Sequence, residues 1–193
     1  HGNGHATFSF TPPVSYGGSV ITSYTVTSNI GGHFATGGAS PITVTGLTNG
    51  VAYTFTVVAT NAEGNSVASA ASNSVTPATV PGAPTGVSAV AGNGQATVSF
   101  TPPVSNGGSV ITSYTVTSNI GGHFATGGSS PITVTGLTNG VAYTFTVVAT
   151  NAEGNSVASS ASNSVTPATV PDAPTIGTAT RGDGEVVITF TAN

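Results

Sequence analysis

The stretch "GLTNGVAYTFTVVATNAEGNS", Gly136–Ser156, decides the fold. Within it, apolar residues alternate with threonines, so that Tyr143 and Phe145 lie on one face of an extended segment and Thr144 and Thr146 on the other. Alternation with a period of two is typical of a β-strand that buries one face, and the flanking Gly and Asn residues mark turns. The stretch therefore predicts a half-buried strand. No helical period occurs elsewhere in the chain, which indicates an all-β fold.

The same stretch occurs again at Gly46–Ser66, so the chain contains an internal repeat. "ITSYTVTSN" likewise begins at Ile21 and at Ile111, which places the copies 90 residues apart. Residues 11–80 differ from residues 101–170 at three aligned pairs: Tyr16/Asn106, Ala39/Ser129 and Ala70/Ser160. Self-similarity at a fixed spacing predicts an array of like units. The repeat frame predicts three units: 1–79, which lacks its first strand; 80–169, which is complete; and 170–193, the first two strands of a third.

The other apolar runs of the complete unit are short and alternate in the same way. In "QATVSFT", Gln95–Thr101, Ala96 and Phe100 point to the side opposite Thr97. Strands with one apolar face and one Thr/Ser face, divided by Gly, Pro, Asn and Ser, predict two antiparallel sheets packed face to face. Proline-containing joins such as "TPATVPGAPT", residues 76–85, predict semi-rigid linkers and a rod-like array.

Three motifs resemble the fibronectin type III family. They are Pro-x-Ala-Pro at the start of a unit, a second strand that ends in an aromatic residue and Pro-Pro, and Leu-x5-Tyr-x-Phe-x-Val followed by Ala-x-Asn-x-x-Gly. The resemblance implies tandem immunoglobulin-like β-sandwiches in which Leu47 with Tyr53, and Leu137 with Tyr143, form tyrosine corners. The chain departs from the family where a second-strand tryptophan is usual and has phenylalanine there: Phe10, Phe100 and Phe190. The near-identical, Ser/Thr/Gly-rich copies resemble bacterial modules.

The low charge excludes several classes of function. Charged residues make up 3% of the chain, with one Arg and five acidic side chains. A nucleic-acid binder needs many Lys and Arg residues to neutralise phosphates, and a calcium site needs clustered carboxylates. The sequence also has no cysteine, and no apolar run approaches the ~20 residues that span a bilayer. We therefore expect no nucleic-acid partner and no membrane insertion of this segment.

No set of residues within one unit suggests catalysis or metal binding. Each repeated unit has one loop carboxylate, Glu63 or Glu153, whereas glycosidase chemistry needs two and a nucleophilic serine needs a base and an orienting acid. His33 and His123 occupy equivalent positions, and one histidine per unit cannot supply the three or four ligands of a zinc site. We expect no enzyme activity, no cofactor and no metal site, and a surface or interface role for these histidines.

The tripeptide Arg181-Gly182-Asp183 spells an adhesion signal. It occupies the position of "GNG" turns elsewhere in the chain, of which the first is flanked by His1 and His5. Gly-x-Gly with Asn or Asp in the middle is turn chemistry, because Gly supplies positive φ and Asn or Asp tolerates it. We therefore interpret the tripeptide as a hairpin turn, with adhesion as the alternative.

These features favour a structural function. We expect an extracellular or cell-surface stalk, fibre or filament body, with other copies of the repeat or chain as partners through strand exchange or lateral association. The alternatives are an adhesion module that binds glycans or a host surface, and a passive spacer in a secreted polysaccharide-degrading enzyme. The incomplete units at the ends are consistent with a window of a longer array, with a polymer in which one tail supplies the first strand of the next chain, or with frayed ends.

Overall fold

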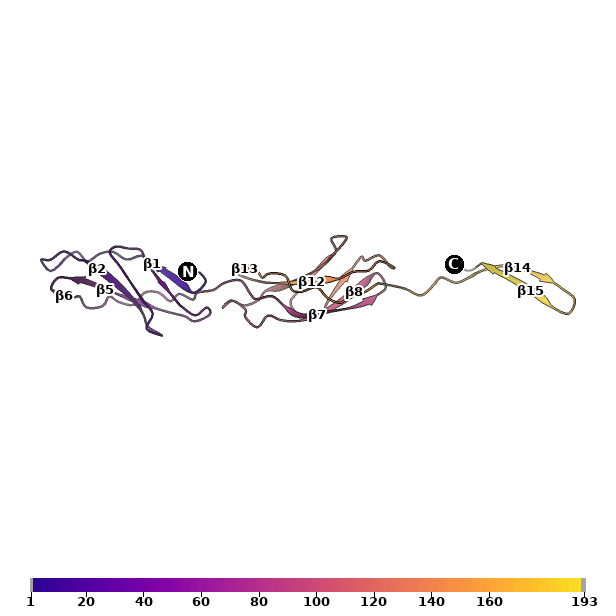
Figure 1. Ribbon diagram of the computed structural model, residues 1–193, viewed down its shortest axis with the longest axis horizontal. Coiled ribbons are helices and arrows are strands. Elements are labelled where there is room, and N and C mark those ends of the chain that lie inside the picture. Colours follow the sequence, from indigo (N-terminus) through magenta and orange to yellow (C-terminus); the bar gives the residue numbers. More distant parts are fainter. Residues whose placement is uncertain (1, 192–193) are drawn as a thin grey trace.

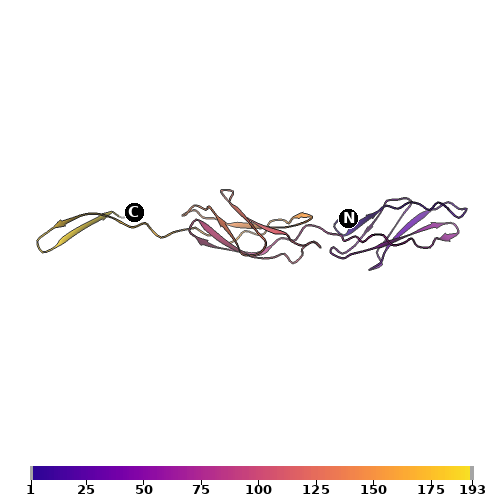
Figure 2. The ribbon, with the colours of Figure 1, turned by 180° about the vertical axis from the view of Figure 1, so that it is seen from behind.

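The computed structural model describes residues 2–191, and all of their regular structure is β-strand. Figures 1 and 2 show an elongated chain in which three bodies follow one another along the long axis. We name them the first repeat (residues 2–79), the second repeat (80–169) and the C-terminal hairpin (170–191). The predicted all-β class and tandem arrangement are confirmed. The unit boundaries stay predictions, and residues 1, 192 and 193 of the predicted units lie outside the described residues.

The second repeat is a sandwich of two antiparallel sheets. One sheet has the strand order β11-β8-β7 and the other β10-β9-β12-β13. The strands are β7 (Thr85–Gly92), β8 (Gln95–Thr101), β9 (Ser113–Ser118), β10 (Phe124–Gly127), β11 (Ile132–Thr135), β12 (Phe145–Asn151) and β13 (Gly154–Asn155). Along β8 and β12 the buried positions alternate with more exposed ones, as the period of two requires.

The first repeat follows the same plan, with a two-stranded sheet, β1-β4, in place of the three-stranded one. Its other sheet has the order β3-β2-β5-β6. The strands are β1 (His5–Phe8), β2 (Ser23–Ser28), β3 (Phe34–Gly37), β4 (Ile42–Thr45), β5 (Phe55–Asn61) and β6 (Gly64–Asn65). Strand β1 has four residues, whereas β8 at the same position has seven. Pairing with β7 accounts for the longer β8, because its last residue pairs with Thr85 of β7.

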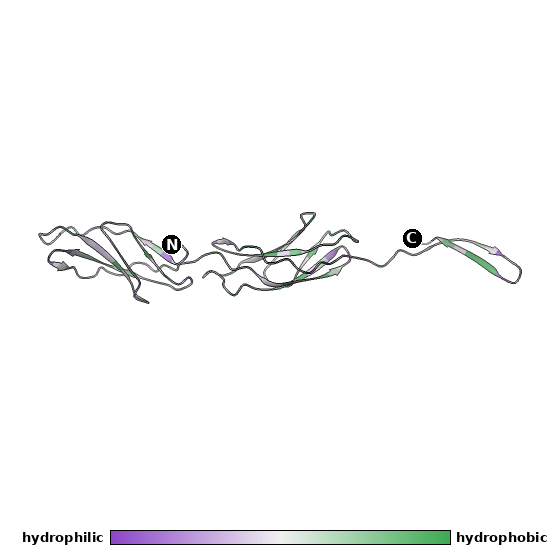
Figure 3. Cartoon of the chain, viewed as in Figure 1, coloured by the Kyte–Doolittle hydropathy of each residue, from purple (hydrophilic) through white to green (hydrophobic). Residues whose placement is uncertain are grey.

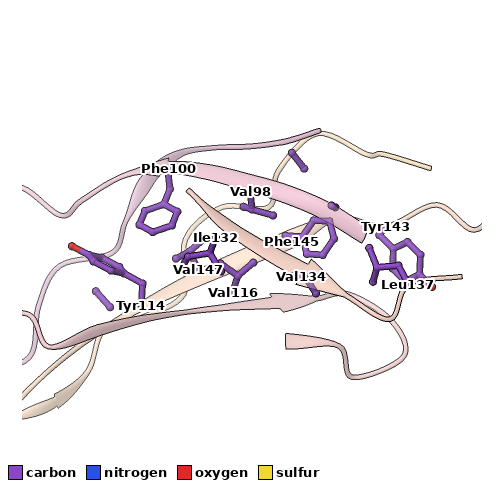
Figure 4. Close-up of a cluster of buried hydrophobic side chains, with 13 residues drawn as sticks. Val98, Phe100, Tyr114, Val116, Ile132, Val134, Leu137, Tyr143, Phe145 and Val147 are labelled. Atoms are coloured by element: carbon purple, nitrogen blue, oxygen red, sulfur yellow. The ribbon is translucent and has the colours of Figure 1, made fainter. Parts of the chain in front are cut away.

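Each repeat has its own apolar core. Figure 4 shows the core of the second repeat, where Val98 and Val134 of one sheet face Val116, Phe145 and Val147 of the other. These five side chains are fully buried. Burial of a side chain of this size stabilises a fold by about 1.5–3 kcal/mol. Each core therefore stabilises its own repeat.

One edge of the four-stranded sheet in each repeat is completed by a segment that is not a regular strand. Every third residue of this segment is a serine that makes two hydrogen bonds to one residue of the neighbouring strand. The serine N–H donates to the carbonyl oxygen of that strand residue, and the serine Oγ accepts from the N–H of that strand residue. We call the segment the serine ladder. Its members are Ser156, Ser159 and Ser162, bonded to Ala149, Val147 and Phe145, and in the first repeat Ser66, Ser69 and Ser72, bonded to Ala59, Val57 and Phe55.

The C-terminal hairpin consists of β14 (Thr175–Arg181) and β15 (Val186–Thr191). The two strands pair antiparallel, with a bulge between Ile176 and Ala179. Every residue of both strands is exposed. Figure 3 shows hydrophobic residues along β15, so the hairpin presents apolar surface to solvent. Two strands alone are marginally stable in water, which makes the hairpin the least supported part of the chain.

Candidate functional site

The junction between the two repeats is the first candidate site, because the contacts there determine how the two repeats are oriented relative to each other. The Asn49–Gly50 loop of the first repeat meets the loop of residues 105–108 of the second repeat. A Cβ added at Gly108 would overlap the backbone nitrogen of Gly50, and a Cβ added at Gly107 would overlap the carbonyl oxygen of Thr79. Backbone therefore packs directly on backbone at this junction, and only glycine allows that approach.

The linker is hydrogen-bonded to both repeats. On the first-repeat side, the Gly50 N–H donates to the carbonyl oxygen of Pro77 at 2.9 Å. On the second-repeat side, the Thr79 N–H donates to the carbonyl oxygen of Gly107 at 2.8 Å. The Gly82 N–H likewise donates to the carbonyl oxygen of Ser105 at 2.9 Å. These bonds satisfy linker backbone groups that a free linker would leave to water, so they fix the path of the chain from one repeat to the next.

Asn151 also connects the linker to the second repeat. Its Nδ2 donates to the carbonyl oxygen of Thr79 at 2.8 Å and to that of Asn106 at 2.9 Å, and the residue is buried. The equivalent Asn61 of the first repeat is half-buried and donates within its own repeat, to the carbonyl oxygens of Tyr16 and Ser19. The same amide therefore closes a loop in one repeat and fastens a linker in the other.

A groove on the first repeat is the second candidate site. Its volume is about 570 Å³. The apolar lining includes Phe10, Ile21, Tyr24, Val57 and Ala59. Polar groups of the lining include Ser66 and Ser69 of the serine ladder, Asn61 and the carboxylate of Glu63. The groove thus combines an apolar floor with a hydrogen-bonding edge, which suits an extended peptide segment.

The predicted tyrosine corners lie at the ends of the cores. The Tyr53 Oη accepts a hydrogen bond from the Thr48 N–H at 3.1 Å, and the Tyr143 Oη accepts one from the Thr138 N–H at 3.1 Å. Leu47 is buried beside Tyr53, as Leu137 is beside Tyr143, so each pair joins the same core. The polar end of each tyrosine is satisfied by the loop that precedes its strand.

The Arg181-Gly182-Asp183 tripeptide lies at the tip of the C-terminal hairpin. Arg181 pairs with Val186, and the Gly182 N–H donates to the carbonyl oxygen of Glu185 at 2.9 Å, which closes the turn. Arg181 and Asp183 are exposed. This geometry is that of a hairpin turn, and an adhesive role stays a prediction.

The histidines lie apart from one another. The ring of His33 lies nearly perpendicular to that of Tyr53, and the ring of His123 to that of Tyr143, with ring centroids 5.9 Å apart in both repeats. The His5 Nδ1 lies 3.1 Å from the carbonyl oxygen of Asn3, and His1 is outside the described residues. Among residues 2–191, no three His, Cys, Asp or Glu side chains come together as a metal site. Nor do these residues include a helix long and apolar enough to cross a bilayer.

Sequence reasoning did not identify three of these features: the glycine contact at the junction, the linker bonds of Asn151 and the serine ladder. The ladder has a signal in the sequence, since serines recur at every third position from Ser156 to Ser162. The junction glycines stand in a Gly-Gly pair that also reads as an ordinary turn. Their close contact with the backbone of Thr79 and Gly50 depends on the neighbouring repeat, so only the three-dimensional structure reveals it.

Comparison with known proteins finds relatives in an archaeon and a bacterium. A Kelch domain-containing protein of Saccharolobus solfataricus is 37% identical over 125 residues, which cover 62% of this chain and 17% of that protein. Chitinase A1 of Niallia circulans is 41% identical over 133 residues, which cover 64% of this chain and 18% of that protein. The chain therefore spans less than a fifth of the length of these curated relatives.

Among solved structures, a crystal structure of domains from titin matches with a TM-score of 0.54, at 23% identity, over 86% of this chain and 60% of that chain. At this level of identity the match shows a shared fold. The family model of the fibronectin type III domain matches residues 2–75 and again residues 82–166, which together are most of the chain. With two sandwiches in tandem and a family match over each, the chain belongs to the fibronectin type III family.

Proposed function

We propose that the chain is a structural spacer, a rod of tandem domains that holds other parts of an extracellular protein at a set distance. The observation that supports this most directly is the junction, where Gly50 packs on Gly108 and the linker bonds to both repeats. A stalk, fibre or filament body of a bacterial cell-surface protein is the setting we propose. Other copies of the repeat or chain are its proposed partners.

The junction supports a rod because bending requires separation of groups that are already in contact. Each linker hydrogen bond contributes about 0.5–1.5 kcal/mol net, and a buried polar group that loses its partner costs about 1–3 kcal/mol. Thermal energy at room temperature is about 0.6 kcal/mol, so a bend that breaks two such bonds is rarely populated. Pro77 and Pro84 are fully buried on either side of the junction, which further limits the linker.

Distances between spin labels on the two repeats test this proposal. The chain has no cysteine, so labels on Thr27→Cys and Thr117→Cys are specific, and both threonines are exposed at equivalent positions of β2 and β9. A rod predicts one narrow distance distribution that salt leaves unchanged. A broad distribution, as two freely jointed domains produce, would contradict the spacer proposal.

A spacer within a polysaccharide-degrading enzyme is the second candidate, favoured by the 41% identity to Chitinase A1. In this proposal the chain itself has no catalytic role, and each repeat has a single carboxylate, Glu63 or Glu153. The test is to replace residues 2–169 in a full-length protein that contains them by a flexible linker of equal length. Loss of activity on insoluble polysaccharide, with activity on soluble fragments retained, supports the enzyme spacer. Unchanged activity on both substrates contradicts it.

A further inference from the structure

One of the few sequence differences between the two repeats lies at the junction. Residues 11–80 and 101–170 differ at three aligned pairs, and one of these pairs is Tyr16/Asn106. Asn106 belongs to the loop of residues 105–108, which meets the Asn49–Gly50 loop of the first repeat. The other two pairs exchange one small side chain for another at exposed positions. The Tyr16/Asn106 pair is therefore the difference that can affect how two repeats are joined.

Asn106 makes two hydrogen bonds that connect the parts of the junction. Its Oδ1 accepts from the N–H of Gly108 at 2.9 Å, and Gly108 is the glycine that packs on Gly50. Its carbonyl oxygen accepts from the Nδ2 of Asn151 at 2.9 Å, and the same Nδ2 donates to the carbonyl oxygen of Thr79 in the linker. The side chain of Asn106 thus supports the glycine contact, and its backbone supports the linker.

A tyrosine at this position keeps the backbone bond and loses the side-chain bond. In the first repeat the Asn61 Nδ2 donates to the carbonyl oxygen of Tyr16 at 2.8 Å, as Asn151 does to Asn106. The loop backbone is also alike, since Gly18 and Gly108 both have a φ of 84°. An asparagine oxygen reaches the N–H two residues on, whereas the hydroxyl of a tyrosine stands at the far end of a rigid ring. The exchange therefore removes one acceptor and leaves the rest of the loop in place.

The missing acceptor matters where a second loop covers the glycine. Gly108 is half-buried, and a Cβ added at Gly50 would lie 3.1 Å from the Gly108 Cα. Water has less access to the Gly108 N–H beneath the neighbouring loop, so an N–H without a protein acceptor is costly there. The bond from Asn106 also orders a Gly-Gly pair, which has more conformational freedom than any other pair of residues. A loop that is ordered before contact loses less entropy when the repeats meet.

We infer that position 106 determines which repeats form the tight junction. A repeat with asparagine at this position, as at Asn106, receives a preceding repeat through the glycine contact. A repeat with tyrosine, as at Tyr16, forms a looser joint when it follows another repeat. This inference rests on the spacer proposal, because it treats the glycine contact as the feature that orients the repeats. One residue type per repeat then decides where a tandem series is stiff and where it bends.

Amide hydrogen exchange, followed by nuclear magnetic resonance on the full chain, tests the bond itself. Asn106→Tyr should make the Gly108 N–H exchange about tenfold faster, because the N–H loses its acceptor. Asn106→Asp should keep the parental rate to within about threefold, since a carboxylate oxygen closes the same turn. Tyr16→Asn is the matched control in the first repeat and should leave Gly108 unchanged. Equal exchange rates in the parent and in Asn106→Tyr would overturn the inference.

The distance between labels on Thr27→Cys and Thr117→Cys tests the effect on the junction. Asn106→Tyr should increase the share of molecules with separated repeats about tenfold, which broadens the distribution, and Asn106→Asp should keep it narrow. Residue 106 is exposed and outside the core, so the denaturant midpoint should stay at the parental value, which distinguishes a loosened junction from an unfolded repeat. A broad distribution in the parent contradicts the spacer proposal. A narrow parental distribution that Asn106→Tyr leaves unchanged overturns this inference alone.

Discussion

Gly108→Ala should loosen the junction between the repeats. The new Cβ would overlap the backbone nitrogen of Gly50 and lie 2.7 Å from the carbonyl carbon of Asn49. Ordinary van der Waals contact begins at 3.4 Å, so the loops must separate by at least 0.7 Å. The Gly50 N–H is bonded to the Pro77 carbonyl oxygen, and the loop therefore pulls the linker with it. The bonds from Thr79 and Gly82 then stretch or break, which weakens the junction by about 1–3 kcal/mol.

A matched control separates this effect from backbone strain. Gly108 and Gly18 both have a φ of 84°, and an added Cβ at Gly18 meets no atom within 4 Å. Both alanine variants carry the cost of positive φ, about 1–2 kcal/mol, but only Gly108→Ala carries the overlap.

Pulsed electron paramagnetic resonance on the Thr27→Cys/Thr117→Cys labelled pair is the assay. We expect Gly108→Ala to broaden the distance distribution and Gly18→Ala to leave it as in the parent. If both variants keep the narrow parental distribution, the glycine contact does not set the junction, and the reasoning is refuted.

Three further predictions concern stability, measured as the free energy of unfolding in denaturant. Ser159→Ala leaves the buried N–H of Val147 without its Oγ acceptor and should cost about 1–3 kcal/mol, whereas Ser69→Ala at the exposed equivalent site should cost less than about 1 kcal/mol; equal losses would contradict the role of burial in the serine ladder. Tyr143→Phe removes the hydroxyl that accepts from the preceding loop and should cost about 1–2 kcal/mol, and a neutral result would show that water replaces the bond. Phe145→Ala should cost about 3–5 kcal/mol and unfold the second repeat first, which two separate cores require; simultaneous loss of both repeats would argue for a shared core.

The sequence could predict the parts of the fold that depend on local alternation. Tyr143 and Phe145 alternate with threonines, and this pattern places them in the core because a strand has only two faces. The hairpin turn at Gly182 was also predictable, because the φ values that a Gly-x-Gly turn needs depend on local sequence alone. The family resemblance added the expectation that Leu47 with Tyr53, and Leu137 with Tyr143, form tyrosine corners.

The junction could not be predicted in this way, because it depends on contacts that one repeat makes with the next. Gly18 and Gly108 stand in the same Gly-Gly pair and have the same φ, and their local sequences differ only at Tyr16 and Asn106, yet one is exposed and the other packs on Gly50. Asn61 and Asn151 likewise differ through the presence of a linker and not through their neighbours in sequence. Equivalent residues of two near-identical repeats therefore make different contacts, and the local sequence pattern does not predict that difference.

A fixed joint between near-identical units has a geometric consequence. One rotation and one translation relate the first repeat to the second, and the second repeat again presents the Gly140 N–H bonded to the carbonyl oxygen of Pro167, as Gly50 is bonded to Pro77. Repetition of this rotation and translation generates a helical array, and the geometry of the junction sets the pitch of that array. Any tandem series built with this joint winds as a superhelix, and a side chain at one position of each copy recurs along that superhelix at regular angular steps.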